Sequence, residues 1–148
     1  MISKILAATD GSKPATQSLR YAVDFAKKIG AELIVLTVID KSVFIRQSVP
    51  SSPRSNKLVE PIEDYMKRVA ESYLQKAAKI CEKNGVPSRT LVRTGHPVEE
   101  IIREAKRSKA DLIILGSHGK SAITAAVVGS VTFGVINRVK KMPILVVR

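Results

Sequence analysis

The sequence predicts a single α/β domain in which helices cover both faces of a parallel sheet. Five short, nearly continuous apolar segments rich in β-branched residues alternate with segments whose apolar residues recur every three or four positions. A length of 148 residues suits one domain with a substantial core. The apolar content of 45%, with charges spread along the chain, is typical of a folded protein.

The predicted strands are short enough to be buried elements of a parallel sheet. Each is bounded by turn residues or by the start of a helical pattern, and repeated strand–helix–strand order gives right-handed crossovers. The strands are expected at residues 3–8, 32–39, 89–94, 111–115 and Ile144–Val147.

Four helices are predicted between these strands. Ser12 is a plausible N-cap of the first, Asn84-Gly85 ends the second, Pro97 opens the third and Met142-Pro143 stops the fourth. The apolar positions that define them are Leu19, Ala22, Val23, Ala26 and Ile29; Ile62, Tyr65, Met66, Val69, Tyr73, Ala77 and Ile80; Val98, Ile101, Ile102 and Ala105; and Val131, Val135, Ile136 and Val139.

One connection departs from the compact pattern. Residues 41–61 hold three prolines and five serines, so we expect a long exposed connection, partly ordered at best, that serves as a lid or a partner surface. No internal repeat and no second domain are predicted.

Composition limits the partners and the compartment. The net charge of +12 favours anions such as nucleotides, nucleic acids or acidic membranes. No apolar run approaches the roughly 20 residues that span a bilayer, and the opening MISKILAATDG lacks the features of a signal peptide. The single cysteine, Cys81, suits a reducing cytosol and is expected to be inert packing, so we predict a cytoplasmic protein.

The segment GSHGKS, residues 116–121, resembles the end of a phosphate-binding P-loop but fails its spacing. The first glycine of a P-loop would occupy position 114, which is Ile114 within a strand pattern. Gly116 and Gly119 are instead followed, after nine residues, by Gly129-Ser130 at a helix start. Such glycines would let main-chain amides converge on an anion, and a helix N-terminus would add donors. The alternative is that Gly116 only ends a strand and Gly129 only permits close packing.

The spacing Gly-x-x-Gly, nine residues, Gly-Ser resembles the nucleotide signature of the ATP-binding subgroup of the universal stress protein family. The resemblance covers nearly the whole chain and includes the segments KILAATDGS, LIVLTVID, GHPVEEI, LGSHGKS and MPILVVR. It implies one domain over residues 1–148 and a Rossmann-like, adenine nucleotide alpha hydrolase-like fold. The implied sheet has five parallel strands in the order 3-2-1-4-5, with ATP, ADP or AMP above the first and fourth strands.

The resemblance also implies the residues of the site. Asp10 would meet the ribose or a phosphate-bound Mg²⁺ or Mn²⁺, because a bare carboxylate about 4 Å from a phosphate costs roughly 4 kcal/mol at an effective dielectric near 20. The alternative for Asp10 is a turn residue beside the helix cap. The main chain of Val38 would pair with the adenine edge. The full expected set is Ala8, Thr9, Asp10, Val38, Leu115, Gly116, Ser117, His118, Gly119, Gly129, Ser130, Val131 and Thr132.

Three functions compete at this point. The leading hypothesis is a nucleotide-binding regulatory or stress-response module that acts as a homodimer through the apolar strand Ile144–Val147. The second is a slow ATPase or nucleotidyl-transfer enzyme, although no general base, Walker lysine or paired carboxylates stand beside the glycines, and no catalytic residue is assigned. The third is nonspecific nucleic-acid binding, which the charge favours but which lacks aromatic stacking platforms.

Overall fold

The computed structural model describes residues 1–42, 56–119 and 128–148. Strands and helices alternate along the chain as the apolar patterns predict. In chain order the elements are β1 (Lys4–Ala8), α1 (Lys13–Ile29), β2 (Glu32–Asp40), α3 (Asn56–Lys83), β3 (Ser88–Gly95), α4 (Pro97–Arg107), β4 (Leu112–Gly116), α5 (Ser130–Arg138) and β5 (Ile144–Val147).

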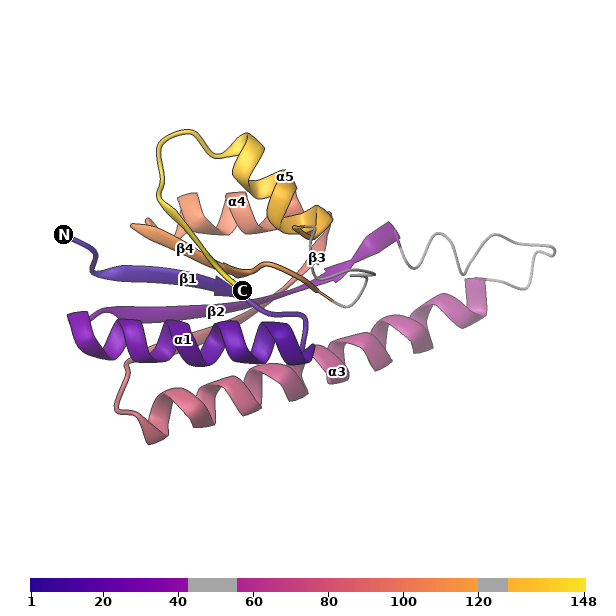
Figure 1. Ribbon diagram of the computed structural model, residues 1–148. Coiled ribbons are helices and arrows are strands. Elements are labelled where there is room, and N and C mark those ends of the chain that lie inside the picture. Colours follow the sequence, from indigo (N-terminus) through magenta and orange to yellow (C-terminus); the bar gives the residue numbers. More distant parts are fainter. Residues whose placement is uncertain (43–55, 120–127) are drawn as a thin grey trace.

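The sheet confirms the expected fold class. Its five strands are all parallel to their neighbours and follow the order β3-β2-β1-β4-β5. Helices α1 and α3 lie on one face and α4 and α5 on the other (Figure 1). The strand order reverses between β1 and β4, where Ala7 lies opposite Ile114. Ligands of open α/β sheets bind at such a reversal, outside the carboxyl ends of the strands.

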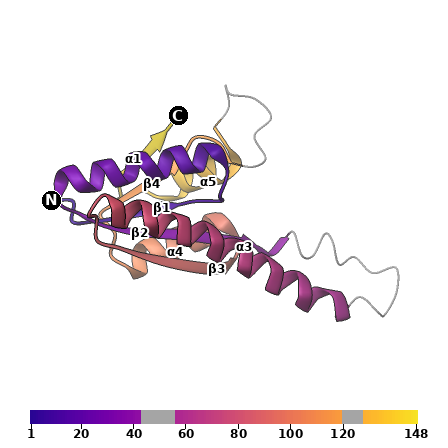
Figure 2. The same ribbon diagram turned by 90° about the horizontal axis from the view of Figure 1, so that it is seen from below.

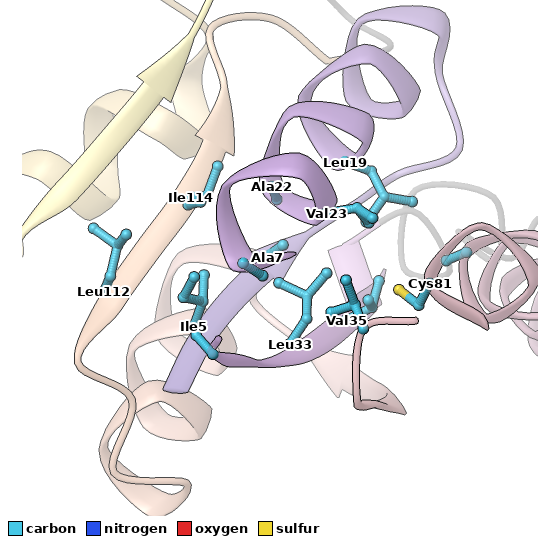
Figure 3. Close-up of a cluster of buried hydrophobic side chains, with 14 of the residues drawn as sticks. Ile5, Ala7, Leu19, Ala22, Val23, Leu33, Val35, Cys81, Leu112 and Ile114 are labelled. Carbon is cyan, nitrogen blue, oxygen red and sulfur yellow. The ribbon is translucent and has the colours of Figure 1, made fainter. Parts of the chain in front are cut away.

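The core divides into two clusters because successive strand residues point to opposite faces. Ile5, Val35 and Ile114 belong to the cluster beneath α1 and α3, where Figure 3 shows them beside helix residues such as Leu19. Leu6, Ile34, Leu36, Ile113 and Leu115 belong to the cluster beneath α4 and α5. Both faces of the central strands are therefore buried, as the continuous apolar segments predicted.

The helix ends follow from local chemistry. Ser12 Oγ accepts a hydrogen bond from Ala15 N at 3.2 Å, which confirms Ser12 as the N-cap of α1. Helix α1 ends at Gly30, whose φ of 70° lies in the left-handed region that glycine tolerates. Helix α4 starts at Pro97, with acidic residues in its first turn and basic residues in its last.

Two predicted boundaries are wrong. Residues 56–61 belong to helix α3 and not to the predicted connection, since Lys57, Leu58 and Glu60 favour helix and the helix continues through Pro61. Helix α5 ends at Arg138 because Val139 is already extended, well before Met142-Pro143. The rest of the predicted connection, residues 43–55, lies outside the described residues.

The two outer strands differ in how their edges are covered. On β3, Arg93 pairs with the buried Glu104 of α4 at 3.0 Å, and Arg89 lies 3.5 Å from Glu32. On β5, all four residues are half-buried.

Among the residues that the structure describes, no helix has the length and apolar content needed to cross a bilayer.

Candidate functional site

The turn after β1 is held by a series of hydrogen bonds to its main chain. Thr9 N–H donates to Leu36 O at 2.9 Å, and Thr37 Oγ1 donates to Thr9 O at 3.1 Å. Asp10 Oδ1 then accepts from Ser12 N at 3.0 Å. Asp10 is therefore fixed, half-buried, between the end of β1 and the start of α1.

The turn after β4 is tied to α5 and β5. Ser117 N–H donates to Val147 O, and Gly129 N–H donates to Ser117 O, each at 2.7 Å. Thr132 Oγ1 donates to Gly116 O at 2.7 Å. These bonds bring the two ends of the glycine signature together across residues 120–127, which lie outside the described part of the chain.

Gly119 lies directly against Asp10. A Cβ placed on Gly119 would stand 2.7 Å from Asp10 Oδ2, closer than real Cβ atoms approach an oxygen. A Cβ on Gly129 would stand 3.4 Å from Ser117 O and 3.7 Å from Gly119 N. Main chain of the turn after β4 thus lies directly against Asp10 at the ends of β1 and β4, with no side chain of Gly119 or Gly129 between them.

None of the described glycines of the signature has a left-handed backbone. The described glycines with positive φ are Gly11, Gly30, Gly85 and Gly95, and none belongs to the signature. Gly119 and Gly129 therefore permit close approach rather than a left-handed turn.

The start of α5 supplies donors, although not all those expected. The first hydrogen bond within α5 runs from Phe133 N to Gly129 O at 2.9 Å, so the amides of residues 130–132 precede it. Gly129 was expected to contribute its own amide, but that amide donates to Ser117 O. Among the described residues, no main-chain acceptor is found for the amides of Ser130, Val131 and Thr132.

The opposite side of the crevice is apolar. Ala8, Val38 and Val131 are half-buried against the cluster that contains the buried Leu115. Leu36 turns its main chain toward β1, as its bond from Thr9 N shows, so Val38 two residues later turns its main chain the same way. Because β1 ends at Ala8, no residue of that strand lies opposite Val38. Its amide and carbonyl face the crevice.

Ser117 and His118 form a polar pair beside the cradle. Ser117 is buried, and its Oγ lies 2.6 Å from His118 Nδ1. Among the buried side-chain atoms of the described residues, His118 Nε2 is the one without a hydrogen-bond partner. The pair is a local donor and acceptor, and the family resemblance implied both residues as members of the site.

A protein-only metal site is not found in residues 1–42, 56–119 and 128–148, where no three His, Cys, Asp or Glu side chains gather. Asp10 is the carboxylate at the crevice. A bound divalent ion would therefore need oxygen atoms from the ligand itself.

Sequence reasoning missed two supports of the Asp10 turn. Gly11 has a φ of 76°, and the ring of Tyr73 on α3 fills the space where its side chain would be. Thr37 is buried and bonds the carbonyl of Thr9. The Asp-Gly dipeptide was a signal for the turn, but Tyr73 had been assigned only to helix packing.

A parallel sheet in the order β3-β2-β1-β4-β5, with helices on both faces, defines the class of open, Rossmann-like α/β proteins. The chain belongs to the Universal stress protein family, whose profile matches residues 1–148.

Individual relatives support this membership along the whole chain. Universal stress protein MJ0577 of Methanocaldococcus jannaschii is 33% identical over 156 residues, covering 100% of this chain and 96% of the relative. The solved structure of MJ0577 superposes with a TM-score of 0.84 over 99% of this chain and 96% of that one. MJ0531 of the same organism is 32% identical, covering 100% of this chain and 83% of the relative.

Two more distant structures carry nucleotides. A universal stress protein solved in complex with cAMP has a TM-score of 0.69 at 24% identity, covering 99% of this chain and 97% of that chain. The protein of Archaeoglobus fulgidus solved in complex with dAMP has a TM-score of 0.65 at 19% identity, covering 100% and 98%. At these identities the likeness concerns the fold.

Proposed function

We propose that this chain is an adenine-nucleotide-binding regulatory module of its family, which holds ATP, ADP or AMP in the crevice between β1 and β4. The observation that carries the proposal is the contact of Gly119 with Asp10. It brings main chain and a carboxylate together at the ends of β1 and β4 with no side chain of Gly119 between them. The nucleotides bound by the cAMP and dAMP complexes of the family support the ligand class.

Each part of a nucleotide has a matching group. The phosphates would accept hydrogen bonds from the amides of Ser130, Val131 and Thr132, each worth roughly 1.5–3 kcal/mol when charge-assisted. The ribose would lie near Asp10. The adenine edge would pair with the main chain of Val38, above the apolar side chains of Ala8 and Leu115.

The charge of Asp10 makes the proposal sensitive to metal ions. A carboxylate near a di- or triphosphate is repelled unless Mg²⁺ or Mn²⁺ bridges the two, whereas AMP carries less charge to repel. We therefore expect EDTA to weaken ATP binding strongly and AMP binding only slightly. Calorimetry with and without Mg²⁺ measures the difference. If Mg²⁺ changed the affinities for ATP and AMP equally, the idea that Asp10 holds the metal would be wrong.

The decisive experiment needs no assumption about which nucleotide is bound. Mass spectrometry of small molecules released from the purified, denatured protein should detect an adenine nucleotide. Calorimetry with ATP, ADP and AMP then ranks them. If the released material contains no adenine nucleotide and none of the three binds, the proposal fails.

One observation favours an enzymatic alternative, a slow ATPase or nucleotidyl transferase. A serine hydroxyl bonded to imidazole, as in Ser117–His118, is the arrangement that activates a nucleophile. Steady ATP turnover that a His118→Gln variant loses while still binding ATP would establish it. Equal turnover by both proteins excludes this role for the pair.

We propose further that the module works as a homodimer through β5. This strand is the last of the sheet, and its four apolar residues are only half-buried in the single chain. Sheet edges of this kind pair with a second strand. The sequence of the edge and its exposure support the dimer.

A further inference from the structure

A second cavity lies at the end of the sheet opposite the proposed nucleotide crevice. It is open to solvent on one side and has a volume of about 570 Å³, between the carboxyl ends of α4 and α5 and the beginnings of β4 and β5. Figure 1 shows these two helices side by side above the same strands. A volume of this size falls within the roughly 300–1,000 Å³ typical of small-molecule pockets.

The walls of this cavity are aliphatic. Ile102, Val139 and Met142 pack partly buried against the core cluster of α4 and α5, and their remaining surface lines the cavity. Among the residues that the structure describes, no aromatic side chain belongs to the lining. A flat base would find no stacking partner there, whereas a flexible hydrocarbon chain would bury apolar surface.

The rim of the cavity is basic. Lys106, Lys140 and Lys141 line it with exposed side chains, and the ion pairs among the described residues include none of them. Arg138 also lines it and lies 3.7 Å from Glu99. Four cations around an aliphatic cavity complement a ligand with an apolar body and an anionic end.

Two features of the cavity oppose an anion, the carboxyl ends of the helices and the carboxylate of Asp111, but the four cations of the rim outnumber that single carboxylate. The carboxyl ends of α4 and α5 carry partial negative charge, but Glu104 O already accepts from Ser108 and Ala105 O from Ala110. The carboxylate of Asp111 accepts hydrogen bonds from Ser3 and Lys4 through Oδ2 at 2.9–3.0 Å. The basic rim therefore dominates.

We propose that this cavity binds a small anionic amphiphile, a straight acyl chain ending in a carboxylate, with the chain against Ile102 and Met142 and the carboxylate among Lys106, Lys140 and Lys141. The site is separate from the nucleotide crevice and does not depend on it. Its ligand class follows from the aliphatic walls and the basic rim.

The test uses the full chain with labelled methionine methyl groups and decanoate as the probe. The three methionines are Met1, Met66 and Met142. Met142 lines the cavity, while Met66 packs on α3 across the sheet. Decanoate should shift the Met142 signal saturably and leave Met66 and Met1 unchanged, and decanol, with the same chain and no charge, should bind at least about tenfold more weakly.

Charge reversal supplies a matched pair of variants. Lys106→Glu/Lys140→Glu/Lys141→Glu should weaken decanoate at least about tenfold, because three cations near one carboxylate change sign. Lys76→Glu/Lys79→Glu/Lys83→Glu changes the net charge equally on the α3 face and should bind decanoate as the wild type does. All six side chains are exposed, so both variants should fold, as thermal unfolding checks.

Several results would overturn the proposal. The Met142 signal could stay unshifted by decanoate, or all three methionine signals could shift in parallel. Decanol and decanoate could bind with equal affinity, or the two triple variants could weaken decanoate binding equally. ATP could also displace decanoate. Retention of decanoate at saturating ATP supports it.

Discussion

At Gly119 the absence of a side chain decides whether the loop after β4 can lie against Asp10. The 2.7 Å separation between a would-be Cβ and Asp10 Oδ2 means that even alanine must displace the carboxylate or the loop. The backbone φ is not the constraint, since Gly119 is absent from the glycines with positive φ. The residue therefore matters for the crevice and little for the fold.

Gly119→Ala should weaken ATP binding by about tenfold or more, the equivalent of one lost charge-assisted hydrogen bond. Its thermal stability should stay close to that of the wild type. Gly30→Ala is the control: its φ is 70° and no atom lies within 4 Å of the added Cβ. That change should cost about 1 kcal/mol of stability through left-handed strain and leave ATP affinity unchanged. An unchanged affinity in Gly119→Ala would refute the cradle.

The hydrogen-bonded carboxylate of Asp111 should make the folding stability of the protein depend on pH. The pKa of its carboxyl lies below the usual value, first because Ser3 N–H donates to it and then because Ser3 Oγ–H and Lys4 N–H do. A pKa lowered on folding stabilises the protein above the unfolded pKa, and this contribution is lost as pH falls through the folded pKa.

Asp111→Asn should therefore be less stable than the wild type near neutral pH, with the difference shrinking below about pH 4. Asp24→Asn on the exposed side of α1 controls for net charge. Melting temperatures measured from about pH 7 to about pH 3 follow both comparisons. A gap between Asp111→Asn and the wild type that is constant over this range would contradict the assignment.

At the scale of elements, α3 has two unlike halves. Leu74, Ala77 and Cys81 are buried in the core, and burial raises the pKa of the Cys81 thiol. Toward the start of the helix Tyr65 is 60% exposed. In Figure 2 this part of α3 extends beyond the strands. The buried side chains of α3 are thus concentrated in its carboxyl half, while Ile62 and Met66 of the amino half pack partly buried against Ile39 and Ala70.

Leu74→Ala should reduce the free energy of unfolding by about 2–5 kcal/mol, because it removes buried methyl groups and leaves a cavity. Tyr65→Ala on the same helix should change it by no more than about 0.5 kcal/mol. Urea unfolding of the two variants compares them directly. Similar losses would mean that the amino half of α3 packs as tightly as the carboxyl half.

Sequence patterns predicted the helices and strands better than their boundaries and the contacts between turns. Continuous apolar segments and period-3.6 apolar patterns reflect burial, so the strands and helices were accessible from sequence, as was the N-cap at Ser12. The start of α3 was predicted after Pro61, because a proline usually marks a helix end. Only the folded chain shows that the helix passes through this residue. The bond from Gly129 N to Ser117 O was equally inaccessible, since it joins residues whose approach depends on the sheet.

At the scale of the whole molecule, the main-chain groups on the outer edge of β5 determine how a second copy would pair with the sheet. Ile113 N donates to Pro143 O and Ser117 N donates to Val147 O, so the odd-numbered residues of β5 turn their main chain toward β4. Ile144 and Val146 therefore turn theirs to the outer edge. A second copy related by a two-fold axis would bond to these two residues in both directions.

Proline scanning of β5 separates assembly from folding. Val146→Pro removes an outward amide, which an edge strand tolerates, so it should keep the fold and convert the expected dimer to a monomer. Leu145→Pro removes an amide that faces β4 and should destabilise the protein by roughly 3 kcal/mol or more. Size-exclusion chromatography with light scattering at micromolar concentration, paired with thermal unfolding, distinguishes the two. A monomeric wild type would eliminate the dimer, and a dimeric Val146→Pro would move the interface away from the main chain of β5.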